Sequence, residues 1–341
     1  MTDQPEARRT PSSISLVEIQ REYLDDLKHR ASESHHANVK SSLKKVLAAL
    51  QVEDLRDLQP IQVIRYRNQQ RDAGLANRSA NMLVDRLRSM LNWAVGCGLI
   101  ESHPLRFIRR LPCSAQHQRY RRRSLTDEEI DRFLAAADED DREVAASSWE
   151  REGRQGERST RRPFGERVPQ APMWWAFLET GARWSEMTST RWIDLDCERR
   201  TLVLRAETTK SKRRRVIPLR QKMIGVLQGV RALHEKMAGG EVSPSSEIFL
   251  SPEGVPWCHA TRNVMRIFDR VLARAKIARV DGEGRKLDIH ALRHTFGSRL
   301  ARHGVGLVQV QRLMGHSDPK LTAQVYTHLD VEDLRKAVEA V

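Results

Sequence analysis

The sequence has no long apolar run and no obvious leader. No apolar stretch approaches the roughly 20 residues that a membrane-spanning helix needs. The first ten residues, MTDQPEARRT, contain no apolar core of the kind found in secretory signals. We therefore expect a cytoplasmic protein with no membrane partner.

Cysteine is scarce. The four cysteines, Cys97, Cys113, Cys197 and Cys258, lie far apart and form no CxxC pair. This spacing predicts neither a disulfide framework nor a cysteine zinc site. We expect four reduced residues that pack in the interior.

Acidic residues are outnumbered. The chain of 341 residues has 59 Lys plus Arg against 45 Asp plus Glu, a formal net charge of +14. Such an excess favours a polyanionic partner such as double-stranded DNA, with a generic basic surface as the alternative. If DNA is the partner, the protein is expected at the nucleoid. The length allows two domains, each with its own core.

The first part of the chain has helical periodicity, and we predict a small all-α domain over residues 12–110. Ser15 and Glu18 form a possible capping box before an apolar stripe. Apolar residues between 39 and 50 repeat with the period of a helix. Pro60 is expected to open a third helix, and Asn77 to cap a fourth.

Arginines mark the outer face of that fourth helix. Arg78, Arg86 and Arg88 lie opposite its apolar residues. They are expected either to follow phosphate groups or to be simply solvated.

The next segment has no acidic residue at all between Ser102 and Thr126, and it carries seven arginines. We predict that residues 111–123 form a basic linker, which could remain a solvated tether or lie along a duplex. Residues 1–11 are expected to be disordered. A second domain, 124–341, starts at a capping box of Thr126 and Glu129. Its charged stretch, about 138–167, is expected to be a loop or a solvated helical extension.

The second domain is predicted to be mainly α-helical with a small β-sheet, an α+β fold. The segment MWWAFLETGARWSEM, from Met173, is typical of a buried helix, a glycine turn and a second helix start. TLVLR (201–205) and RVIPL (215–219) are short strand patterns around the basic turn TTKSKRRR, and they predict a hairpin. The remainder is mostly helical.

Four residues near the end of the chain have the chemistry of phosphodiester cleavage. His290 and Arg293 are three apart, so on a helix they share a face and can reach the same phosphate. Gly315 ends an apolar helical turn and would direct His316 toward that face. Tyr326, the only tyrosine after Tyr120, is the single candidate for a phenol nucleophile in this region.

Five motifs in order resemble those of the tyrosine recombinases, the phage integrase family. They are TGARWSEM (180–187), TTKSKRRRVIPL (208–219), HALRH (290–294), LMGH (313–316) and YTHL (326–329). The resemblance covers residues 124–338 strongly, as the catalytic domain, and 12–110 weakly, as a helical core-binding domain. The charged stretch before Pro172 is longer than the family leads us to expect.

The resemblance assigns a role to each matched residue. Arg183 and Arg293 would neutralise the scissile phosphate, with Glu186 at the acidic position beside the first arginine. Lys210 would protonate the leaving 5′ oxygen as general acid. His290 would accept or relay the tyrosine proton, and His316 would donate to a phosphate oxygen. Tyr326 would attack and form a 3′-phosphotyrosyl enzyme.

The function implied is site-specific DNA recombination, for integration, excision or resolution of a mobile element. The phosphotyrosine bond conserves the energy of the broken diester, so the family implies neither ATP nor a metal. It also implies a homotetramer on paired DNA sites, with possible accessory DNA-bending proteins.

Several alternatives stay open. His290 and His294 with His316 or His328 could bind zinc, but no HExxH arrangement is present and both arginines would be unexplained. Lys212 could replace Lys210 as the general acid. The chain could also be a catalytically idle DNA-binding protein of the same fold or a relaxing enzyme like the type IB topoisomerases.

The last residues have an apolar stripe of Leu334, Val338 and Val341. It would either fold back on its own domain or, as the resemblance implies, dock on a neighbouring protomer.

Overall fold

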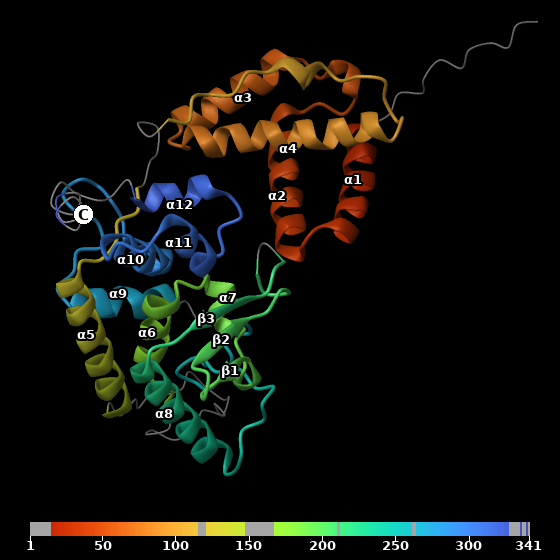
Figure 1. Cartoon of the computed structure of the whole chain (residues 1–341). Coiled ribbons are helices and arrows are strands. Elements are labelled where there is room, and N and C mark those ends of the chain that lie inside the picture. The colour runs from red at the N-terminus through yellow and green to blue at the C-terminus, as the bar shows by residue number, and fades with distance from the viewer. Residues whose placement is uncertain are drawn as a thin grey trace, which may run out of the picture. The chain divides into compact units, whose positions relative to one another are not determined.

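A computed structural model describes residues 15–114, 121–146, 167–209, 212–260 and 264–326, together with 335 and 339. The chain forms two compact units, Met1–Arg119 and Tyr120–Val341 (Figure 1). The expected disordered segment 1–11 and the apolar stripe of the C-terminal tail lie outside the described residues.

The first unit is all-α in its described part, as predicted. Its helices are α1 (Leu16–Arg30), α2 (Glu33–Leu50), α3 (Pro60–Asp72) and α4 (Asn77–Gly96). The capping box of Ser15 and Glu18 is confirmed at the start of α1, and Pro60 is the first residue of α3. The prediction that Asn77 caps α4 is wrong. Asn77 is already helical, and its side-chain amide instead donates to the carbonyl of Pro112.

Two of the three arginines on α4 donate hydrogen bonds to backbone carbonyls of the first unit. The guanidinium of Arg86 donates to the carbonyl of Asn38 on α2. Arg88 donates to the carbonyls of Leu105 and Ile108. For these two, the expectation of a simply solvated side chain was wrong, because carbonyls of the same unit accept from them. A contact with phosphate groups stays a prediction. Arg78 is exposed.

The second unit is mainly helical with a small sheet, so the predicted α+β class is confirmed. Two short segments, α7 (Trp184–Thr188) and the 3-10 helix η4 (Trp192–Asp194), precede the sheet. The remaining helices are α5 (Asp127–Ala146), α6 (Ala171–Thr180), α8 (Gln221–Ala238), α9 (Val264–Arg274), α10 (Ile289–Arg302), α11 (Leu307–Met314) and α12 (Pro319–Tyr326).

The predicted hairpin is confirmed and is part of a three-stranded antiparallel sheet. β2 (Thr201–Leu204) pairs with β3 (Arg215–Pro218), with Leu202 opposite Ile217. The third strand, β1 (Leu195–Asp196), pairs with β2 and was not predicted, since two residues are too short to show a period.

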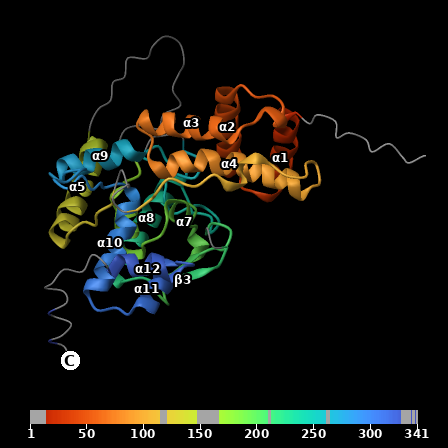
Figure 2. The same cartoon turned by 90° about the horizontal axis from the view of Figure 1, so that it is seen from above.

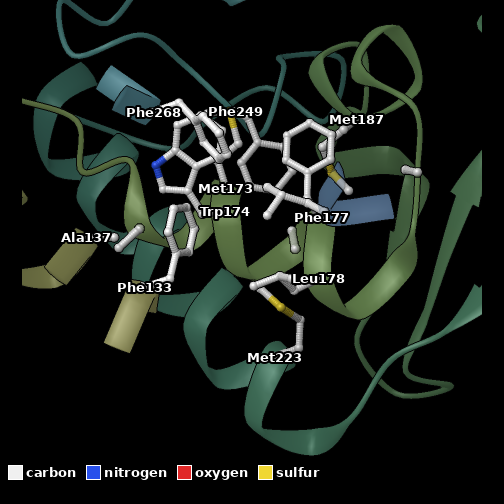
Figure 3. Packing of buried hydrophobic residues seen from close by; sticks show 14 of the residues in the cluster. Phe133, Ala137, Met173, Trp174, Phe177, Leu178, Met187, Met223, Phe249 and Phe268 are labelled. Carbon is white, nitrogen blue, oxygen red and sulfur yellow. The ribbon is translucent and has the colours of Figure 1, made fainter. Parts of the chain in front are cut away.

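The core of this unit is built around α6, whose sequence APMWWAFLET is apolar on nearly every side. α6 packs against α5, α8 and α10, which fits a helix without a solvent face. Trp174 packs its ring against Phe133 of α5 and Phe268 of α9 (Figure 3). This aromatic contact fixes the helix that carries the following glycine turn.

The charged stretch is helical as far as the structure describes it, since α5 continues to Ala146; residues 147–166 lie outside the described part. Its acidic groups are not merely solvated. Asp140 is buried and pairs with Arg270 of α9 at 2.5 Å. The carboxylate of Asp141 accepts hydrogen bonds from the backbone N–H groups of Gln170 and Ala171 at the start of α6. Burial raises the pKa of Asp141 to about 6.

The four cysteines are free and exposed, so the prediction that they pack in the interior was wrong. Their wide spacing excluded a framework of disulfides but contained no information on burial. No helix among the described residues is both long and apolar enough to span a bilayer.

Gly181 ends α6 in a turn that packs closely against α10. Its φ of +58° lies in the left-handed region, and a β-carbon there would overlap the ring of Phe296 on α10. Gly239 ends α8 in the same conformation, at φ +71°, but has open space around it. The two glycines therefore share a backbone requirement and differ in packing.

We predict that Gly181→Ala destabilises the protein more than Gly239→Ala. The left-handed conformation costs either alanine about 1–2 kcal/mol, and the contact with Phe296 adds about 1–3 kcal/mol at position 181 only. Urea unfolding of both variants and the parent measures the difference. Equal losses of unfolding free energy would show that Phe296 moves aside without cost.

Candidate active site

Helix α10 presents two of the predicted residues on one side of the second unit. Asp288 caps its start by accepting from the backbone N–H of Ala291. His290, in the first turn, is exposed, whereas Arg293 is only 2% exposed. The guanidinium of Arg293 donates to the carbonyl of Gly181 at 2.5 Å and to the carbonyl of Met314. These two carbonyls, one from the turn after α6 and one from the end of α11, fix the position of the buried guanidinium.

Arg183 stands where the glycine turn after α6 enters α7. Its backbone N–H donates to Glu186 Oε2 at 2.9 Å, and its guanidinium donates to Glu186 Oε1 at 2.7 Å. Glu186 is fully buried, while the Arg183 side chain retains 23% exposure. The carboxylate therefore holds the first arginine and leaves part of its donor edge accessible.

His316 follows the glycine that ends α11, as the sequence predicted. Gly315 has φ +62°, and its carbonyl accepts from Arg183 at 3.5 Å. His316 Nδ1 lies 2.9 Å from the hydroxyl of Thr322, a buried residue of α12. Helices α10, α11 and α12 pack on one another, with α11 also against β3 (Figure 2).

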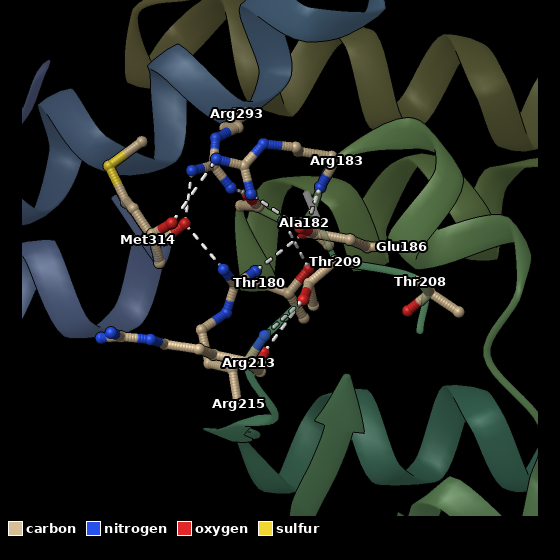
Figure 4. A network of polar contacts seen from close by, with 12 residues as sticks. Thr180, Ala182, Arg183, Glu186, Thr208, Thr209, Arg213, Arg215, Arg293 and Met314 are labelled. Carbon is tan, nitrogen blue, oxygen red and sulfur yellow. Dashed lines mark hydrogen bonds and ion pairs between the residues drawn. The ribbon is translucent and has the colours of Figure 1, made fainter. Parts of the chain in front are cut away.

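A third arginine completes the cluster and was not singled out from the sequence. Arg215, the first residue of β3, donates to Glu186 Oε2 at 2.9 Å and to the Met314 carbonyl at 2.7 Å (Figure 4). Arg215 ends the basic run KSKRRR, so the sequence alone does not distinguish it from the residues of the turn. The available signal was the alternation of the strand, which places Arg215 on the same face as the buried Ile217.

The arginines of this cluster act on one another through a poorly solvated interior. Burial, followed by the charges of Arg183 and Arg215, lowers the pKa of Arg293 to about 9. Burial alone would raise the pKa of Glu186, but hydrogen bonds from Arg183 and the charge of Arg215 lower it below its usual range. The site therefore holds an anion-binding surplus of positive charge.

The histidines beside the arginines are neutral at pH 7. Burial lowers the pKa of His316 to about 4, and Arg293 and Arg183 add to this effect. Although His290 keeps an exposed surface, partial desolvation of its ring and then the charge of Arg122 lower its pKa to about 4. His294, a residue the sequence suggested only as a zinc ligand, contacts the ring of His290 edge-on at 5.3 Å.

Arg122 was predicted to belong to a flexible or DNA-tracking linker. Instead its Nε donates to Asp288 Oδ2 at 2.8 Å, and its neighbour Arg123 pairs with Glu129. The end of the predicted linker is thus fastened to the start of α10. It supplies a cation that acts on His290 and His294.

Two of the predicted residues cannot be placed as side chains. Tyr326 is the last residue of α12, the helix whose Thr322 contacts His316, and its side chain lies outside what the structure describes. Lys210, which stands between β2 and β3 in the sequence, lies outside the described residues. Lys212, two residues on, is exposed, with φ +48°.

The zinc alternative has no support in the described residues. One group of three metal-ligating side chains occurs there, Glu247, Cys258 and His259. Their ligand atoms lie within 4.8 Å of one another. His290, His294 and His316 are not in such a group, and His328 lies outside the described part. Glu247 is paired with Arg191, so the group found is not a free ligand set.

The geometry suits a phosphodiester better than a metal. Arg183 is anchored on the carboxylate of Glu186, and Arg293 on the carbonyls of Gly181 and Met314. With a neutral histidine beside them, two such guanidinium groups have the chemistry to donate hydrogen bonds to the non-bridging oxygens of one phosphate. Their partners are protein groups that are already in place, so both guanidinium groups are held before any anion binds.

Comparison with known proteins places residues 166–333 in a match to the phage integrase family. Tyrosine recombinase XerC of Thermodesulfovibrio yellowstonii is 31% identical over 162 residues, 46% of this chain and 49% of the relative. Tyrosine recombinase XerD of Brucella suis is 33% identical over 179 residues, 51% of this chain and 53% of the relative. The chain thus spans about half the length of these curated relatives in the aligned region.

Solved structures share the fold over nearly the whole chain. A lambda integrase tetramer bound to a Holliday junction superposes with a TM-score of 0.66 at 19% identity, covering 94% of this chain and 80% of that one. The integrase of transposon Tn1549, in complex with transposon right end DNA, has a TM-score of 0.62 at 18% identity and covers 95% and 99%. At these identities the likeness concerns the fold.

We predict that Arg122→Gln raises the pKa of His290 and of His294, because it removes a positive charge that disfavours their protonated forms. His316 should keep its low pKa, since its lowering comes from burial and from Arg293 and Arg183. Titration of histidine ring resonances by NMR measures all three. An upward shift of His316 as large as that of His290 would show instead that the whole site has loosened.

Proposed function

Because the chain belongs, through residues 166–333, to the phage integrase family of tyrosine recombinases, we propose that it is a site-specific DNA recombinase. It would cut and rejoin double-stranded DNA through a 3′-phosphotyrosyl intermediate. The observation that carries the proposal is the cluster of Arg183 and Arg293. Glu186 binds Arg183, the Met314 carbonyl binds Arg293, and His316 lies beside them, in contact with Thr322.

The cluster supports a phosphate-binding role for these residues. Arg183 and Arg293 would donate to the non-bridging oxygens and stabilise the charge that grows as the phosphorane forms. His316 would add a third donor from Nε2. That role needs the tautomer in which Nδ1 accepts a hydrogen bond, and the hydroxyl of Thr322 lies at 2.9 Å to provide it.

Proton transfer would be handled by two other residues. His290 is neutral at pH 7 because of its lowered pKa, so it can accept or relay the proton of the attacking phenol. Lys210, in the turn of the hairpin, would protonate the 5′ oxygen as it leaves, with Lys212 as the alternative. The reaction needs no cofactor, since the phosphotyrosine bond keeps the energy for rejoining.

The proposed substrate is cytoplasmic DNA carrying a defined site, with a mobile element as the source. The named relatives are tyrosine recombinases, and the lambda integrase structure is a tetramer on a Holliday junction. By analogy this chain would act as a homotetramer on paired sites, with accessory DNA-bending proteins where the site requires them. Its helical domain, residues 12–110, would bind the core site, and residues 124–341 would carry the chemistry.

We predict that Tyr326→Phe abolishes covalent attachment to DNA, because the phenol oxygen is the nucleophile. The parent protein, incubated with nicked duplexes, should form an adduct whose tryptic peptide contains Tyr326. Sequencing the attached DNA would give the target site. An adduct that persists in Tyr326→Phe would disprove the assignment, and relaxation of supercoiled DNA without any site preference would favour a topoisomerase.

We predict that Arg293→Ala slows adduct formation by on the order of 100-fold or more, the usual effect of removing a donor to a developing oxyanion. Duplex affinity should change by only a few-fold, because it comes from many basic residues. The matched control is Arg220→Ala, which removes an exposed arginine paired with Glu179. If binding and cleavage fall by the same factor, Arg293 does not act in the transition state.

A further inference from the structure

Arg215 is an arginine in an uncommon position. It begins β3, directly after the basic turn, and its side chain is only 9% exposed. Its Nε is buried and has no hydrogen-bond partner in the described part of the chain. An unsatisfied buried donor costs about 1–3 kcal/mol, so stability alone does not account for a charged residue here.

Arg215 connects three segments that carry the proposed chemistry. One nitrogen donates to Glu186 on α7, and another donates to the carbonyl of Met314 at the end of α11 (Figure 4). The last carbonyls of a helix lack partners within it and carry partial negative charge, so a guanidinium is a strong partner for them. The hairpin is thereby tied to the turn that precedes His316.

Each partner of Arg215 is shared with one of the two phosphate-binding arginines. Glu186 also binds Arg183, through its other carboxylate oxygen, and the Met314 carbonyl also accepts from Arg293. Three guanidinium cations and one carboxylate leave this cluster with a surplus of two positive charges. Without Arg215, Glu186 would cancel the charge of Arg183 and the surplus would fall to one.

The reaction itself sets the charge that has to be matched. A phosphodiester carries one negative charge, and attack by a phenolate brings a second one into the phosphorane. We propose that Arg215 is a positioning residue for this reaction. By neutralising Glu186 and clamping the Met314 carbonyl, it leaves the charges of Arg183 and Arg293 available to the scissile phosphate. This inference rests on the proposed function.

The test compares Arg215→Met with a matched control, Arg205→Met. Arg205 follows β2 and also pairs with a buried carboxylate, Asp194, and donates to a backbone carbonyl, that of Ser189. It is not part of the arginine cluster. Both variants therefore lose a similar structural contact, but only one loses a charge beside Glu186.

Each full-length variant is given two suicide duplexes that contain the target site. One has the normal scissile phosphate, and the other has a methylphosphonate, which lacks the negative charge. Arg215→Met should slow adduct formation on the phosphate by on the order of 10- to 100-fold and on the methylphosphonate by only a few-fold. DNA affinity should stay close to that of the parent. Arg205→Met should have the same effect on both substrates.

Wild-type rates for Arg215→Met, or equal losses on both substrates, would overturn the inference while leaving the proposed function intact. If the parent protein itself formed no adduct, the proposed function and this inference would both be wrong. Should Arg215→Met not fold, Arg215→Gln replaces it, because glutamine also removes the charge but keeps a hydrogen-bond donor; its loss should still be greater on the phosphate.

A second measurement needs no DNA. Burial lowers the pKa of His316 most, the charges of Arg293 and Arg183 come next, and the charge of Arg215 makes a smaller contribution of the same sign. NMR titration should therefore show a raised His316 pKa in the Arg215 variant and no change in Arg205→Met. An unchanged value in both would place Arg215 too far from the turn to position it.

Discussion

The candidate site of the second unit depends on three arginines held close together in the interior. Arg183, Arg215 and Arg293 gather around one fully buried carboxylate, Glu186, and around carbonyls at the end of α11. Cations this close in a poorly solvated site repel one another, and the lowered pKa of Arg293 reflects this. The fold overcomes the repulsion by supplying fixed acceptors from three elements: Glu186 on α7, the carbonyl of Gly181 at the end of α6, and the carbonyls of Met314 and Gly315 at the end of α11. A bound phosphate would relieve it further.

The core explains how that arrangement is held. α6 is apolar on nearly all sides, so it is fixed by α5, α8 and α10 together, and the Gly181 turn emerges from it at a defined place. The carbonyl of that glycine accepts from Arg293, and Arg183 follows two residues later. The site is therefore built on short turns between packed helices, which position side chains more firmly than a long loop would.

Local signals carried most of the sequence-based prediction. Capping boxes at Ser15 and Thr126 begin helices as expected, and the hairpin pairs in register. The prediction for Asn77 was wrong because its side-chain amide donates to the Pro112 carbonyl. The prediction of solvated side chains for Arg86 and Arg88 was wrong because carbonyls distant in sequence accept from them. The cysteines failed because spacing contains no information on burial. Apart from the cysteines, each error concerns a partner from elsewhere in the chain.

The sequence by itself determined the residue types and their order: two arginines, two histidines and a late tyrosine, in motifs that resemble one family. These follow from local spacing and side-chain chemistry. Only the tertiary structure decided that Arg215 turns inward to share Glu186 and the Met314 carbonyl, and that Arg122 fastens onto Asp288 beside His290. Such contacts join segments up to 166 residues apart. Their formation depends on how the helices pack, which no short window of sequence encodes.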